Sequence, residues 1–157
     1  MTSKNRSKEI IENLNVKDLP FKIDEISLND LGMDIAEDLS KILSGINSCP
    51  ALKWCLSTVK KVKVFVIIYQ ANERGHSIYK EEIAKKLPEY SYKTIATIID
   101  EGIAKKYYIP LAPHKKDVKD KKIKNIRPSL EVITAFYNWN IERISTVARL
   151  IKKYSKK

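Results

Sequence analysis

A proline near the middle of the chain divides its most patterned stretch into two short helices. Pro88 removes an amide donor and disfavours helical geometry in the residue before it, so a helix over residues 78–87 is expected to end there. Ser91 is suited to cap a second helix, whose buried face would be formed by the isoleucines within residues 95–99. Gly102 should weaken this second helix by about 1 kcal/mol relative to alanine, so its end is expected to fray or stop early.

The sequence then predicts two short strands separated by a lysine-rich loop. Residues 107–111 form the first, in which Pro110 favours an edge position, and Ile123 and Ile126 mark the second. Residues 114–122 between them contain no glycine, which indicates a long loop rather than a tight turn. This order of helices, strands and loop is that of a winged helix-turn-helix, a mainly α fold with a small β wing.

The segment before this stretch is apolar. A helical stripe begins at Leu52 and continues into a β-branched run over residues 62–69. A run as short as this also suits a buried strand. The length of the whole segment and the polar residues that follow the run favour a buried helix ending at Gly75. Residues 51–128 are therefore expected to form one winged helix-turn-helix domain.

An amphipathic helix is predicted near the N-terminus. Residues 1–50 would form a helical extension with a disordered tip over residues 1–7 and a helix over residues 29–46, capped by Ser27 or Asn29. Acidic residues fall mostly on the outer side of this helix. Its apolar stripe needs a partner surface, either the core of its own chain or a second subunit, and comprises Leu31, Ile35, Leu39, Ile42, Leu43 and Ile46.

The C-terminal segment, residues 129–157, carries the clearest helical pattern. Ser129 is suited to cap it, and residues 130–154 in one helix would be roughly 38 Å long at 1.5 Å per residue. That length exceeds the width of a small domain, so part of the apolar stripe is expected to pack against the N-terminal helix or a second copy of the chain. A homodimer is predicted, with an interface formed by Ile133, Tyr137, Ile141, Ile144, Ala148 and Ile151.

Positive charge is concentrated in the same part of the chain as the helix-turn-helix pattern. The 157 residues carry a formal net charge of +11. Residues 1–50 hold 6 Lys/Arg against 9 Asp/Glu, whereas residues 51–157 hold 24 against 10. A basic domain of this size commonly binds nucleic acid, because a positive field attracts polyanions. Lysine-rich faces also keep proteins soluble, so charge alone leaves both interpretations open.

The sequence carries no pattern typical of an enzyme or a metal protein. It lacks a glycine-rich phosphate loop, a nucleophile motif and any metal-ligand spacing, so no catalytic residue, cofactor or metal is expected. Cys49 and Cys55 are interpreted as reduced thiols, with oxidation sensing left open, and His76 and His114 as surface residues. No run approaches the ~18 apolar residues of a membrane span. No apolar segment follows the charged start to make a signal peptide, so a cytoplasmic protein without membrane contact is expected.

Two stretches resemble the MarR-type winged-helix transcription regulators. Residues 91–100 (SYKTIATIID) are similar to that family's recognition helix, with its serine cap, a threonine three residues later, paired β-branched residues and an aspartate. Residues 120–122 (DKK) resemble the Asp-x-Arg motif of the family's wing, with lysine in place of the usual arginine, and Gly102 stands where leucine is usual. The resemblance covers residues 55–130 and implies a dimer formed by helices from both chain ends. Each subunit would place one recognition helix in the DNA major groove and one wing near the minor groove.

These observations predict a DNA-binding transcription regulator that acts as a homodimer on a pseudo-palindromic site in double-stranded DNA. The recognition helix would contact bases or phosphates through Ser91, Tyr92, Lys93, Thr94 and Thr97. The wing would contact phosphates through Lys115, Lys116, Lys119, Lys121, Lys122, Lys124 and Arg127. The alternative is an architectural or interaction module that binds nucleic acid or protein without sequence-specific regulation. The target site, the sign of regulation and any small-molecule effector are left open by the sequence.

Overall fold

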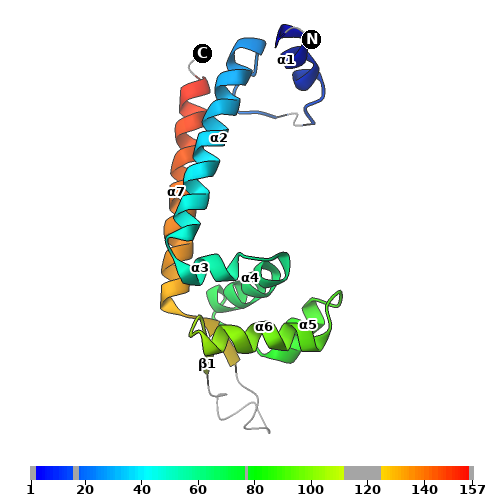
Figure 1. Ribbon diagram of the computed structural model, residues 1–157, viewed down its shortest axis with the longest axis vertical. Coiled ribbons are helices and arrows are strands. Elements are labelled where there is room, and N and C mark those ends of the chain that lie inside the picture. The colour runs from blue at the N-terminus through cyan, green and yellow to red at the C-terminus, as the bar shows by residue number, and fades with distance from the viewer. Residues whose placement is uncertain (1–2, 16–17, 77, 112–124, 156–157) are drawn as a thin grey trace. The chain divides into compact units, whose positions relative to one another are not determined.

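Over the residues that the structure describes, the chain is mainly helical, with one small antiparallel sheet of two strands (Figure 1). The chain divides into two compact units, one formed by residues 47–137 and the other by residues 1–46 together with 138–157. None of the described helices is long and apolar enough to cross a membrane. The computed structural model describes residues 3–15, 18–76, 78–111 and 125–155.

The unit of residues 47–137 is built from short helices and the strand pair. The single helix expected to continue from Leu52 is wrong, because the Thr58 hydroxyl accepts the amide hydrogen of Lys61 at 3.2 Å and starts a new helix. The run over residues 62–69 lies inside that new helix, which confirms the helical interpretation. The chain leaves it through Gly75, whose φ of 71° suits glycine. The helices are α3 (Pro50–Cys55), α4 (Val59–Glu73), α5 (Lys80–Lys86), α6 (Tyr92–Ala104) and the start of α7 (Leu130–Ser155).

The two strands form a short sheet that one further extended residue joins. β1 (Tyr108–Leu111) pairs antiparallel with β2 (Asn125–Pro128). Ile78 adds an isolated bridge to Ile126, whose amide nitrogen donates to the Ile78 carbonyl at 2.7 Å. The helix expected from residue 78 therefore begins later, because Ile78 is held in an extended pairing. α5 ends before Pro88, as the sequence predicts.

The core of this unit draws on α4, α5, α6 and both strands. The prediction that the isoleucines within residues 95–99 form the buried face of α6 is confirmed. The start of α7 also belongs to this core, since Phe136 packs edge-on against Phe65 with ring centroids 5.2 Å apart. Ser129 caps α7 as predicted, accepting the amide hydrogen of Val132 at 3.2 Å. The fully buried side chains include Phe65, Ile68, Ile83, Ile95, Ile99, Tyr108 and Ile126.

α6 continues through Gly102, which packs against aromatic rings. A Cβ added at Gly102 would lie 2.7 Å from Tyr108 Cε2 and 3.1 Å from Trp54 Cη2. Tyr108 is fully buried, so its ring cannot move aside without cost. The expectation that the helix frays or stops early at Gly102 is wrong, because α6 extends to Ala104 and the missing side chain makes room for the ring.

In the second unit, α2 (Glu25–Asn47) lies beside the C-terminal part of α7 (Figure 1). The helix α1 (Ser3–Glu12) precedes α2 and occupies most of the stretch over residues 1–7 that the sequence suggests is disordered. The cap of α2 is displaced from the predicted positions. Asp24 Oδ1 accepts the amide hydrogen of Ser27 at 2.7 Å, and Ser27 Oγ accepts the Asp24 amide hydrogen at 3.2 Å. This reciprocal pair forms a capping box, which starts the helix earlier than expected.

The contact between α2 and α7 includes polar pairs as well as apolar and aromatic side chains, since Leu31 and Tyr154 are buried and Trp139 donates to the Ile42 carbonyl. Asp38 is 7% exposed and accepts a hydrogen bond from Arg149 Nη2 at 2.9 Å. Asp34 accepts one from Lys153 Nζ at 2.6 Å. Leu39, by contrast, is 53% exposed. The prediction that the acidic residues lie mostly on the outer side of this helix is wrong for Asp34 and Asp38, which pair with cations of α7. It is confirmed for Glu37, which is exposed and pairs with Lys41 of the same helix.

Asp34→Asn is expected to destabilise the pairing of α2 with α7 at neutral pH. Hydrogen bonds from Lys153 and Tyr154 hold the pKa of the Asp34 carboxyl below its usual value. A carboxyl with a lowered pKa contributes stability above its unfolded pKa of about 3.9, and that stability is lost as the pH falls through the folded value. Urea unfolding of both proteins at a series of pH values measures the effect. The difference should shrink below about pH 4, and a difference that stays constant into stronger acid would contradict the argument.

Candidate nucleic-acid interface

α6 starts with a side-chain cap that uses two of the predicted site residues. Thr94 donates its amide hydrogen to Ser91 Oγ at 3.1 Å, and the two side-chain oxygens lie 2.9 Å apart. Both residues therefore lie together at the N-terminal end of α6, as predicted, with their hydroxyls engaged in starting the helix.

Lys93 and Thr97 lie at the centre of the exposed face of α6. Successive residues of a helix turn by about 100°, which places positions 93, 97, 100 and 104 opposite the buried isoleucines. Both side chains are exposed. Thr97 Oγ1 donates to the Lys93 carbonyl at 2.8 Å, so the Thr97 oxygen remains free to accept a hydrogen bond. Asp100 shares this face and is missing from the predicted site residues, although its place in the same motif could have indicated it.

Tyr92 lies at the edge of this face and contacts α5. It is 49% exposed, and its hydroxyl donates to Glu81 Oε1 at 3.2 Å. Burial and the Glu81 carboxylate raise the pKa of the Tyr92 hydroxyl, so it stays a protonated donor. Asp100 is paired with Lys80 of α5 at 2.5 Å. α5 therefore borders one flank of α6 through two polar contacts.

The other flank of α6 is bordered by the end of α3 and the first turns of α4. Trp54 donates its indole N–H to Glu101 Oε1 at 2.9 Å, near the C-terminal end of α6. Lys61 lies over the Trp54 ring, 4.4 Å from its centroid. Each acidic residue of α6, Asp100 and Glu101, therefore has a partner within the unit.

Three lysines at the start of α4, here called the α4 lysine cluster, lie beside the turn that precedes α6. The cluster comprises Lys60, Lys61 and Lys63. Lys63 Nζ lies 2.6 Å from Glu89 Oε1, and Lys60 and Lys63 lie 5.8 and 5.5 Å from the centroid of the Tyr90 ring. None of the three is among the predicted site residues. The run KKVK was visible in the sequence, but nothing in it indicated that α4 would lie beside α6.

Most of the predicted wing lies outside the described residues. Arg127 is described: it lies in β2 opposite Ile109, and its side chain is exposed. Its charge is therefore accessible to a partner. The predictions that fall outside the described residues are those for His114, Lys115, Lys116, Lys119, Lys121, Lys122, Ile123 and Lys124.

The residues predicted for a dimer interface are mostly exposed within the single chain. The side of α7 that faces α2 instead carries Trp139, Arg149 and Lys153. Within the unit that contains α2, the predicted residues Ile141, Ile144 and Ala148 are therefore left exposed. Tyr137, Ile141 and Ile144 are 45%, 57% and 68% exposed, Ala148 is exposed, and Ile133 and Ile151 are half-buried.

The two cysteines are free thiols, and one of them is inaccessible. Cys55 is fully buried, and this burial raises the pKa of its thiol to about 12. It therefore stays protonated at neutral pH and is a poor target for oxidation. Cys49 is half-buried. Within the part of the chain that the structure describes, no group of three or more His, Cys, Asp or Glu side chains could hold a metal ion.

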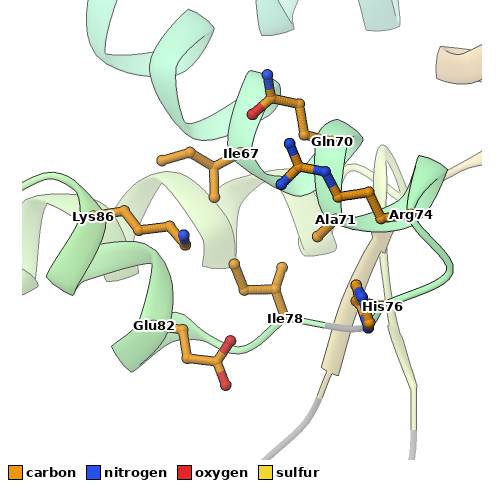
Figure 2. Close-up of a pocket in the computed structure, with 8 residues that line it drawn as sticks. All are labelled: Ile67, Gln70, Ala71, Arg74, His76, Ile78, Glu82 and Lys86. Atoms are coloured by element: carbon orange, nitrogen blue, oxygen red, sulfur yellow. The ribbon is translucent and has the colours of Figure 1, made fainter.

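A pocket of about 240 Å³ opens between the end of α4, Ile78 and α5. Figure 2 shows Ile78 between the side chains of Lys86 on one side and Arg74 on the other. Glu82 and Lys86, four residues apart, line the pocket from one side of α5. Lys80, on another side of α5, contacts α6 instead. The pocket is therefore separate from the exposed face of α6.

The chain matches no protein-family model, and no curated protein matches its sequence. The resemblance to the MarR-type regulators therefore stays a prediction from residues 91–100 and 120–122.

Proposed function

We propose that the chain is a homodimeric DNA-binding transcription regulator of the MarR-like, winged helix-turn-helix type. α5 and α6 would be the helix-turn-helix, and β1 and β2 the base of the wing. The observation that carries the proposal is the exposed face of α6, where Lys93 and Thr97 project from a capped helix with lysines on both flanks. Such a face, on a chain of net charge +11, suits the base edges and phosphates of a major groove. The proposal includes no catalytic activity and no cofactor.

Exposed apolar side chains on α2 and α7 support the homodimer in this proposal. Soluble monomers rarely leave large contiguous apolar patches uncovered. A second copy carries the same exposed side chains and would bury them in a self-complementary interface. The two recognition helices would then enter successive major grooves, with half-sites about 10 bp apart or a multiple of that. Among the described residues of 1–46 and 138–157, the large apolar side chains at least 51% exposed are Met33, Ile35, Leu39, Leu43, Ile141, Ile144 and Val147.

Titrations of the full chain on duplex DNA, followed by fluorescence anisotropy across a salt series, test the proposal. Selection from random duplexes first provides the preferred site. The affinity is expected to fall steeply with salt, because each phosphate contact adds about −0.9 to the slope of log K against log salt concentration. Absent binding, or an affinity that does not respond to salt, would refute the proposal.

Thr97→Val is expected to reduce the preference for the selected site over an unrelated duplex by about 1–3 kcal/mol. Valine keeps the branched shape but removes the hydroxyl that would accept from a base edge. Thr134→Val, at an exposed position on α7, is the matched control and should leave the preference unchanged. An architectural module that binds DNA without sequence preference would show the same ratio of affinities for both variants and the parent chain.

A further inference from the structure

The α4 lysine cluster lies along one flank of α6, near both the start and the end of that helix. Lys60 and Lys63 lie over the ring of Tyr90, in the turn that directly precedes α6. Lys61 lies over the ring of Trp54, which is hydrogen-bonded to the far end of α6. The cluster therefore runs beside the exposed face that would read DNA.

The aromatic rings position these ammonium groups without neutralising them. A ring face attracts a cation through its quadrupole but carries no net charge. Among the described acidic residues, Glu89 alone forms an ion pair with the cluster, through Lys63. Cations held in place before binding lose less side-chain freedom when they meet an anion. The cluster is thus a positioned and largely uncompensated positive surface.

We propose that the α4 lysine cluster is a second phosphate-contact surface, which binds the backbone of the same DNA duplex whose major groove receives α6. This inference rests on the proposed function. The major groove is about 12 Å wide and is bordered by a phosphate backbone on each side, so a helix inside it brings its flanks close to phosphates. On binding, Lys63 exchanges the Glu89 carboxylate for a phosphate oxygen, and Lys60 and Lys61 contact phosphates directly.

Two cations on the opposite side of α5 provide a matched control. Arg74 and Lys86 line the pocket of Figure 2, which is separate from the exposed face of α6. Replacing both by glutamine removes two positive charges. The test variant of the cluster, which combines Lys60→Gln and Lys63→Gln, also removes two. The two double variants therefore have the same net charge and differ in whether the lost charges lie beside α6.

Salt-dependent titrations of the full chain on duplex DNA test the proposal. Lys60→Gln with Lys63→Gln is expected to reduce the magnitude of the salt slope by about 2 and to weaken binding to all duplexes by roughly tenfold or more at ~0.1 M salt. The Arg74→Gln, Lys86→Gln control is expected to keep the wild-type slope. Glu89→Gln is expected to tighten binding several-fold, because it removes the carboxylate that competes with phosphate for Lys63.

The outcomes separate this inference from the function on which it rests. If the wild-type chain binds DNA with a steep slope and the cluster variant keeps that slope, the second phosphate surface is refuted while the proposed function stands. If the wild-type chain does not bind duplex DNA, both fail. A cluster variant that changes the preference between sequences at an unchanged slope would also overturn the inference, since phosphate contacts carry no sequence information. A cluster variant whose salt slope changes on an RNA duplex but not on duplex DNA would overturn the inference as well.

Discussion

Replacing Gly102 by leucine is expected to destabilise the chain by about 3 kcal/mol, and replacing it by alanine by about 1–2 kcal/mol. A single added carbon there would lie 2.7 Å from Tyr108 Cε2. Because Tyr108 is fully buried, the clash would force strained side chains or a shift of the backbone. The gain in helix propensity, about 1 kcal/mol for alanine, only partly offsets this cost. Urea unfolding followed by circular dichroism measures the loss.

Gly32 of α2 is the matched control for the two Gly102 variants. Apart from the neighbouring residues and the backbone of α2 itself, no atom of the described residues lies within 4 Å of a Cβ added at Gly32. Gly32→Ala is therefore expected to raise the free energy of unfolding by about 1 kcal/mol. The fluorescence of Trp54, whose Cη2 lies 3.1 Å from the added carbon at Gly102, would report local repacking. Stabilisation by alanine at both glycines would contradict the packing argument.

The central stretch shows which signals in the sequence predict structure and which do not. The caps at Ser91 and Ser129 and the helix end before Pro88 are predicted well, because each acts within one turn of the chain. Gly102 is misjudged because helix propensity is local, whereas the ring that needs its space comes from a strand. The prediction that a helix begins at Ile78 is wrong for the same reason, since the partner of Ile78 in the sheet is distant in the sequence.

The faces of the helices are harder to predict than the helices themselves. Periodicity indicates that α2 is amphipathic, but it does not identify which face meets α7. Asp38 and Asp34 face inward because Arg149 and Lys153 of α7 are there to pair with them, whereas Glu37 stays exposed. In the candidate interface, likewise, the positive charge of α4 is visible in the sequence, whereas its position beside α6 depends on tertiary contacts. The predicted apolar stripe of α2 is therefore covered only in part: Leu31 is buried, whereas Leu39 is 53% exposed.

Ile144→Glu is expected to dissociate the proposed homodimer, raising its dissociation constant by at least roughly 100-fold. Ile144 is 68% exposed in the single chain. In a symmetric dimer the substitution acts twice, and each glutamate would lose hydration in an apolar interface without a cationic partner, at a cost of about 3 kcal/mol or more. Sedimentation velocity over a range of concentrations measures the constant.

Ser145→Glu adds the same charge at the next position of α7, about 100° around the helix, and is the matched control for Ile144→Glu. Ser145 is exposed, and the substitution is expected to leave the dissociation constant within a few-fold of the parent value. Ile144→Glu should also weaken binding to a full pseudo-palindrome far more than binding to a single half-site, because only the full site benefits from two linked recognition helices. Equal dissociation by both glutamates, or a parent chain that sediments as a monomer at roughly 10 µM and above, would remove the dimer while leaving the DNA-contact face of α6 to be tested separately.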